Sequence, residues 1–353
     1  MEDGKMNDEY LVYNEELKCY ELDPEQKVRD DVEKNRWKLN WQLIVKDWRL
    51  YVMLIPMILV FLFWRYFPMY ELLGCFKITE VGKAVADMKW CGFANFKMLM
   101  FGTTTTTTAF WRAFRNTFLL SFYGLLFGFP MPIILALFFN EIKSDILRSI
   151  YQVLTYLPKF MSTVVMTTLV AMLLKQGDLV SGTGIVSLAL AKLGIISKEA
   201  ADAGLLNNPA YFRSIYQISG IWEGAGYDSI VYFAAIIAVS PTSYEAAQID
   251  GAGKMAQMRY VVLPSILSTV VIMLINRIGS LLSIGYEKVM LLYKASTFVT
   301  ADVVSTFAYR IGLEGGGTQA VASAAEMINN ITGMILVIGA NSIAKKASDV
   351  SLY

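Results

Sequence analysis

Four ionisable side chains lie inside long apolar stretches of this chain, where a charge is costly to keep. They are Glu223, Asp228, Arg277 and Glu326. A charged group within a membrane-spanning helix generally faces a wet cavity or a partner of opposite sign, and it often marks the route of a solute. We therefore expect these residues to face a pathway, with Arg277 either paired with one of the three carboxylates or in contact with a solute.

Two of these carboxylates could also do acid–base chemistry in a membrane-embedded enzyme. Glu223 and Asp228 are five residues apart, so one helix would place them on different faces, which weakens the pair. The chain contains no histidine, which removes histidine-based general bases, Ser-His-Asp nucleophiles and histidine-ligated metals. We predict no catalytic residue and no metal site.

The composition is that of a membrane protein. Of the 353 residues, 55% are hydrophobic and only 17% are charged, against about 25% charged in soluble domains. A net charge of +1 gives no indication of nucleic-acid binding. A helix needs about 20 largely apolar residues to cross the hydrocarbon core. Six stretches qualify: residues 50–67, 118–139, 150–174, 215–239, 263–284 and 320–343.

A polar segment, residues 240–264, separates the fourth and fifth of these spans. It reads as two short helices joined at Gly251. Thr242 and Glu245 have the spacing of a capping box, and Ala246 and Ala247 would leave one helix face flat enough to press against a partner. Asp250 ends the first helix, and Leu263 with Pro264 opens the next apolar helix.

This segment resembles the cytoplasmic loop of bacterial ABC importer permeases, the membrane components of binding-protein-dependent transport systems. That loop has the pattern Glu-Ala-Ala, three residues, Gly, nine residues, Ile, any residue, Leu-Pro. Glu245, Ala246, Ala247, Gly251, Leu263 and Pro264 are in register, with Val261 at the Ile position. The chain is most similar to the carbohydrate branch, in the group associated with polysaccharides and complex oligosaccharides. Further resemblances are Phe67–Tyr70, Gly128–Leu137 with Asn140-Glu141, Tyr156–Pro158, Ile221–Glu223, Tyr232–Ala235, and Ala301–Val304 with Tyr309-Arg310.

The resemblance implies an all-α, polytopic protein with six transmembrane helices, the type I ABC importer fold, and a coupling-helix loop that docks on an ATPase. It implies a second homologous permease, usually a different chain, two cytoplasmic ATPase subunits that hold ATP and Mg, and an extracytoplasmic solute-binding protein. The chain has no Gly-x-x-x-x-Gly-Lys-Ser/Thr motif, so we expect no cofactor in it and no ATP hydrolysis by it.

Basic residues flank both ends of the predicted membrane domain, residues 50–346. Arg36, Lys38, Lys46 and Arg49 precede it, and Lys345 and Lys346 close it. Because basic flanks favour the cytoplasm, we predict both termini on the cytoplasmic face of the bacterial inner membrane. Residues 1–35 would form a polar cytoplasmic tail. Residues 36–49 would form an amphipathic interfacial helix whose tryptophans lie at the lipid surface.

Several expectations concern the cargo and the outer side. Trp222, Tyr227 and Tyr286 could stack on sugar rings, while Gly220, Gly224 and Gly226 would allow close helix packing or a kink in the fourth span. Thr103–Thr108 reads as an outer linker, Gly184–Leu193 as a short outer helix, and Cys75 and Cys91 as unpaired thiols. Two alternatives remain open besides the enzyme. One is an ABC permease for a non-carbohydrate such as a peptide or amino acid, and the other is an ion-coupled secondary transporter.

Overall fold

The computed structural model describes residues 11–14, 19–22, 45–46, 48–80, 82–177, 182–314 and 319–347. Its chain divides into two units, residues 1–72 and 73–353. The first unit holds an antiparallel hairpin, β1 (Leu11–Asn14) with β2 (Cys19–Leu22), and the apolar helix α3 (Trp48–Phe61). Apart from this hairpin, the elements of the described residues are helices, so the all-α prediction is confirmed. Most of the predicted tail and of the interfacial helix, residues 36–49, lies outside the described residues.

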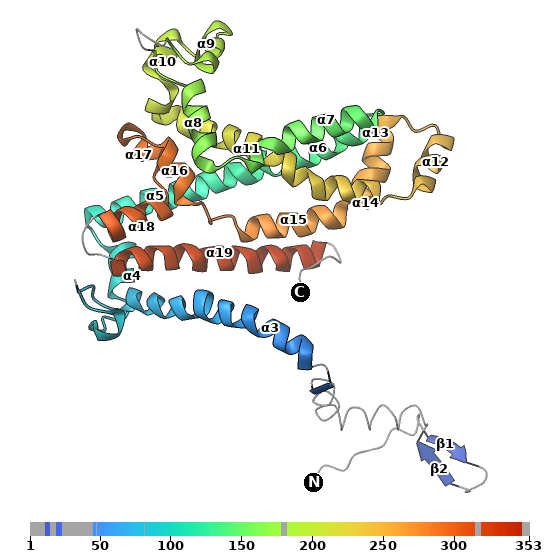
Figure 1. The fold of residues 1–353 in the computed structure, drawn as a ribbon, viewed down its shortest axis with the longest axis horizontal. Coiled ribbons are helices and arrows are strands. Elements are labelled where there is room, and N and C mark those ends of the chain that lie inside the picture. The colour runs from blue at the N-terminus through green and yellow to red at the C-terminus, as the bar shows by residue number, and fades with distance from the viewer. Residues whose placement is uncertain are drawn as a thin grey trace. The chain divides into compact units, whose positions relative to one another are not determined.

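The second unit is helical and is drawn from teal to red in Figure 1. Its first half contains α4 (Ala94–Phe101), α5 (Thr105–Tyr123), η5 (Gly124–Gly128), α6 (Pro130–Glu141), α7 (Asp145–Tyr156), η6 (Leu157–Phe160), α8 (Thr163–Leu173), α9 (Ile185–Lys192), α10 (Lys198–Ala203) and α11 (Pro209–Ile237). Its second half contains α12 (Pro241–Ile249), α13 (Lys254–Gln257), η8 (Met258–Val262), α14 (Leu263–Ser265), α15 (Leu267–Gly279), α16 (Tyr286–Leu292), η9 (Ala295–Thr297), α17 (Phe298–Ala301), α18 (Val304–Tyr309), η10 (Arg310–Glu314) and α19 (Gln319–Ala347).

The described residues include three unbroken helices long and apolar enough to cross a membrane: Trp48–Phe76, Thr105–Glu141 and Gln319–Ile343. In the first of these, η2 (Leu62–Tyr66) and η3 (Phe67–Phe76) continue α3. Three further candidates are pairs of helices bent at a short break: α7–η6 with α8 (103°), α11 with α12 (69°), and α13–α14 with α15 (63°). Six spans therefore follow if each bent pair crosses once.

One linker prediction and two span predictions need correction, each for a local reason. The threonine run is not a linker, because Thr104 accepts a hydrogen bond from the Thr107 amide and starts α5. The third span is not one helix, because Ser162 caps a new helix, α8, after the turn at η6. The fifth span breaks near Pro264, which has no amide hydrogen for the helical ladder; α15 then ends at Gly279 rather than at residue 284.

Other expectations are confirmed. The expected short helix is α9, which begins after Gly184 and ends at Lys192, while its place on the outer side stays a prediction. Cys75 and Cys91 are not joined by a disulfide in the described part of the chain. A Cβ on Gly226 would lie 2.1 Å from the Thr155 carbonyl oxygen, so this glycine allows α11 and α7 to touch.

The middle of α5 is tied to the C-terminal third of the chain by a buried carboxylate. Asp302 is fully buried, and Arg310 donates to both its oxygens at 3.1 and 2.7 Å. Arg112 of α5 lies 3.7 Å away, and Thr306 donates to the same carboxylate at 2.9 Å. Asn116 of α5 donates to the Asp302 carbonyl at 3.1 Å. This network fixes α5, α17 and α18 against one another.

Candidate functional site

The predicted docking loop forms two short helices joined at a left-handed glycine. Gly251 has φ +76°, a conformation that residues with a Cβ rarely adopt. The Gly251 amide donates to the Gln248 carbonyl at 3.0 Å, and the Ala252 amide donates to the Ala247 carbonyl at 2.8 Å. This pair of bonds is a Schellman motif, which ends α12 and satisfies its last carbonyls. The capping-box prediction is wrong: Ser240 is the N-cap residue, and Thr242 lies inside the helix.

One side of α12 is anchored to the transmembrane helices. Tyr244 packs on a core cluster that includes Ala136, Tyr232 and Ile236, and its phenol is hydrogen-bonded to Asn140. Burial raises the pKa of that phenol. Just past the glycine turn, Lys254 forms an ion pair with Glu141 at the end of α6. Tyr244 and Lys254 were not among the predicted site residues, because neither belongs to the loop pattern itself.

The other side of α12 is open. Glu245 and Ala246 are exposed, Ala247 is half-buried, and Ile249 is 86% exposed. Asp250, Leu263 and Pro264 are also exposed. A cavity of about 590 Å³ lies between the ends of α6 and α11 and the helix α12, lined by Asn140, Ile236, Tyr244 and Glu245 among others. In Figure 1, α12 projects at the opposite end of α11 from α9 and α10.

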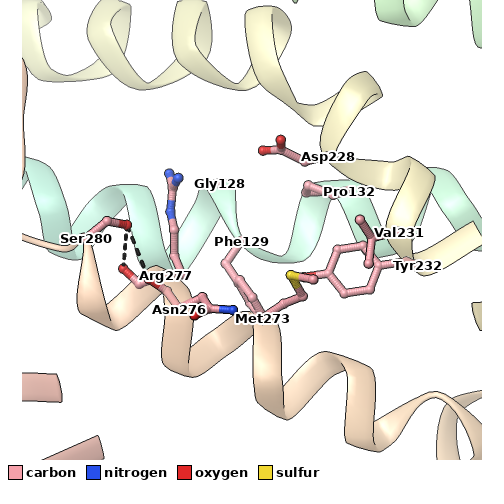
Figure 2. A pocket seen from close by; sticks show the side chains of 10 residues that line it. All are labelled: Gly128, Phe129, Pro132, Asp228, Val231, Tyr232, Met273, Asn276, Arg277 and Ser280. Atoms are coloured by element: carbon pink, nitrogen blue, oxygen red, sulfur yellow. Dashed lines mark hydrogen bonds between the residues drawn. The ribbon is translucent and has the colours of Figure 1, made fainter. Parts of the chain in front are cut away.

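Arg277 lies in a second cavity, of about 260 Å³, between α6, α11 and α15. Figure 2 shows its side chain extending from α15 toward Gly128, with Asp228 projecting from α11 on the opposite side. A Cβ on Gly124 or Gly128 would lie 3.9 Å from the Arg277 Nη2 atom. Asn276 and Ser280 complete the polar part of the lining.

The expected ion pair of Arg277 does not form within the described residues. Glu223 pairs instead with Lys288 at 2.7 Å, and that ammonium also lies 5.4 Å from the centre of the Tyr216 ring. Asp228 shares the cavity but is not within ion-pair distance of Arg277. Glu326 is half-buried on α19 and does not line the cavity. The structure therefore brings Arg277 and Asp228 together and leaves Glu223 and Glu326 elsewhere.

The three predicted stacking aromatics also lie outside this cavity. Trp222 is 45% exposed on α11. Tyr227 makes an edge contact with Phe160 at 6.0 Å between ring centres. Tyr286 stacks on Tyr309 at 5.2 Å. The aromatic rings that do line the cavity are Phe129 and Tyr232, which sequence analysis did not select as site residues.

Comparison with known proteins places the chain in a family. Residues 128–292 match the family described as binding-protein-dependent transport system inner membrane component. Protein LplB of Bacillus subtilis (strain 168) is 33% identical over 316 residues, covering 89% of this chain and 94% of LplB.

The chain belongs to this family.

Members of this family are membrane components of transport systems, which is consistent with the prediction that the chain is not an enzyme. The polygalacturonan/rhamnogalacturonan transport system permease protein YteP of Bacillus subtilis (strain 168) is 34% identical to this permease, covering 88% of it and 92% of YteP. A crystal structure of a bacterial ABC transporter that imports the acidic polysaccharide alginate matches 87% of the permease and 98% of that chain, with 38% identity and a TM-score of 0.74. A second structure, with alginate pentasaccharide-bound periplasmic protein, gives a TM-score of 0.75 at 38% identity, covering 88% and 99%. The match supports the type I importer fold.

Proposed function

We propose that this permease forms half of the translocation pathway of an ATP-driven importer for an oligo- or polysaccharide. A solute-binding protein delivers the cargo from outside, and a second homologous permease supplies the other half. The named cargoes of YteP and of the two alginate importer structures are polysaccharides, and one of those structures contains a loaded binding protein. In this proposal the termini and α12 lie on the cytoplasmic face of the inner membrane.

The observation that carries the proposal is the shape of the docking loop. The small and exposed face around Glu245 and Ala246 can enter a cleft on an ATPase, while Tyr244 and Lys254 fix the opposite side to α6 and to the core. Two such ATPase subunits hold ATP and Mg. Their closure then moves α12 and, through Glu141, the end of α6. The permease itself makes and breaks no covalent bond.

A bulky residue on the open face tests the docking assignment. Ala246→Trp adds volume at an exposed position, so the permease should fold normally but lose ATPase co-purification and uptake. Ala295→Trp, exposed on η9, is the matched control and should keep both. Normal ATPase binding and uptake by Ala246→Trp, at unchanged thermal stability, would contradict the assignment.

A further inference from the structure

We propose that Arg213 and Arg277 are two cationic points of one binding track, and that the track takes a saccharide carrying repeated carboxylates, such as a chain of uronic acids. This inference rests on the proposed function, because it presumes a saccharide cargo. It adds the chemical class of that cargo and the residues that select it.

One face of α11 provides a wall of the track. Arg213, Gln217, Ile221 and Asp228 follow each other at intervals of four, four and seven residues, which places them on one side of the helix. The first three line a cavity of about 570 Å³, together with Tyr123 and Phe127. Asp228 lines the cavity that contains Arg277.

The linings of the two cavities approach each other at the π-helical turn η5. A Cβ on Gly124 would lie 3.4 Å from the Gln217 Oε1 atom and 3.9 Å from the Arg277 Nη2 atom. A Cβ on Gly128 would lie 3.9 Å from both Ile221 Cγ1 and Arg277 Nη2. Because both residues are glycines, no side chain separates Gln217 from Arg277. Single π-helical turns within α-helices are frequent at functional sites.

Both guanidinium groups retain donors for an anion. Arg213 donates from Nη2 to Asn116 at 3.0 Å, while its buried Nε has no hydrogen-bond partner in the described structure. Arg277 makes no ion pair with any described residue. Arg277 can therefore bind a carboxylate through two parallel hydrogen bonds, whereas Arg213, whose Nη2 is engaged and whose Nε is buried, contributes mainly its positive charge.

The spacing favours a chain of acid groups over a single one. Arg277, on α15, lies beside Gln217 and Ile221 of α11. Those two residues follow Arg213 by four and eight positions along α11. That is about 6–12 Å of helix rise between the two levels, a separation that carboxylates on successive sugar rings can match. Gln217, Asn276 and Ser280 can bind sugar hydroxyls between and beside the cations. Asp228, at the end of the track away from Arg213, repels a carboxylate but accepts hydrogen bonds from sugar hydroxyls. Lys288 adds no free positive charge, because Glu223 neutralises it.

The test compares two probes in the complete transporter, reconstituted with its sister permease, ATPases and binding protein. One probe is an oligogalacturonate, and the other is the same oligosaccharide with its carboxyl groups reduced to alcohols. Because the binding protein is the same throughout, a change in the ratio of the two uptake rates reports on the permease. Arg277→Gln should lower uptake of the charged probe about tenfold or more and leave the reduced probe nearly unchanged, since a charge-assisted contact is lost. Arg277→Lys should recover part of that loss.

The role of Arg213 is tested with a substitution beside it, which leaves its hydrogen bond to Asn116 in place. Ser214→Asp puts a carboxylate at an exposed position in the same cavity and should also lower uptake of the charged probe selectively. Arg148→Gln, on α7 and outside both cavities, should change neither rate. Equal loss of both probes in Arg277→Gln and Ser214→Asp would overturn the track, while saccharide import itself would stand. Uptake of neither probe nor of any other saccharide by the wild type would instead contradict the proposed function.

Discussion

Single residues set how closely the helices pack. Gly226 is the clearest case, because a methyl group there would overlap the Thr155 carbonyl. Gly226→Ala should cost about 1–3 kcal/mol of stability through overpacking. Gly224→Ala is the matched control on the same helix, since its Cβ would meet the Asp228 carboxylate at an ordinary 3.6 Å. Thermal unfolding in detergent should separate the two variants, and equal stability would contradict the packing argument.

The Asp302 carboxylate is the second residue whose loss should be severe. Asp302→Asn leaves Arg310 and Arg112 without their buried counter-ion, and removing one partner of a buried pair costs about 3–5 kcal/mol. Asp145→Asn breaks an exposed pair with Arg148 and should have a much smaller effect. Expression yield and thermal stability measured side by side provide the comparison. An Asp302→Asn variant as stable as Asp145→Asn would contradict the structural role of the network.

Among the elements, α12 depends on the turn that ends it. Gly251→Val forces a β-branched residue into a left-handed conformation, at a cost of about 1–2 kcal/mol, so the helix should end differently. ATPase co-purification should fall while the spans remain folded. Gly253→Val tests the same substitution two residues later, where φ is −69° and no atom lies within 4 Å of the new Cβ. ATPase binding that is equally weak in both variants would argue against a specific role of the turn.

Sequence patterns predicted the elements well where the signal was local. The two-helix loop around Gly251 and the short helix α9 were each predicted from a few neighbouring residues, and of the three glycines expected to allow close packing only Gly226 lies against a backbone atom. The broken third span was not, because hydropathy measures the burial of a segment in lipid and cannot detect a helix restart capped by Ser162. The threonine run looked like low complexity, yet its side chains start α5.

The partners of the charged side chains were the least predictable part of the site. Glu223 pairs with Lys288, 65 residues away, and Asp228 rather than Glu326 shares the cavity of Arg277. Both outcomes depend on how α11, α15 and α16 pack, which no local pattern encodes. Arg213 was missed because it lies just before the predicted fourth span, where an arginine looks like an ordinary boundary residue.

For the whole molecule, the proposed function predicts complete dependence on partners. The purified permease alone should neither hydrolyse ATP nor take up saccharide into vesicles. Activity should appear only with the sister permease, two ATPase copies and a loaded binding protein. Uptake by the lone chain driven by an ion gradient would favour a secondary transporter instead.

The helix Thr105–Glu141 has a mechanical consequence. Its 37 residues extend about 55 Å, well beyond a hydrocarbon core of about 30 Å. Glu141 at one end pairs with Lys254 of the docking loop, and Arg112 and Asn116 of the Asp302 network lie part-way along the other half. The π-turn η5 divides the helix into arms of 19 and 12 residues, α5 and α6. If η5 acts as the fulcrum, a small displacement of the shorter arm at Glu141 produces a larger one, in the opposite direction, at the far end of the longer arm.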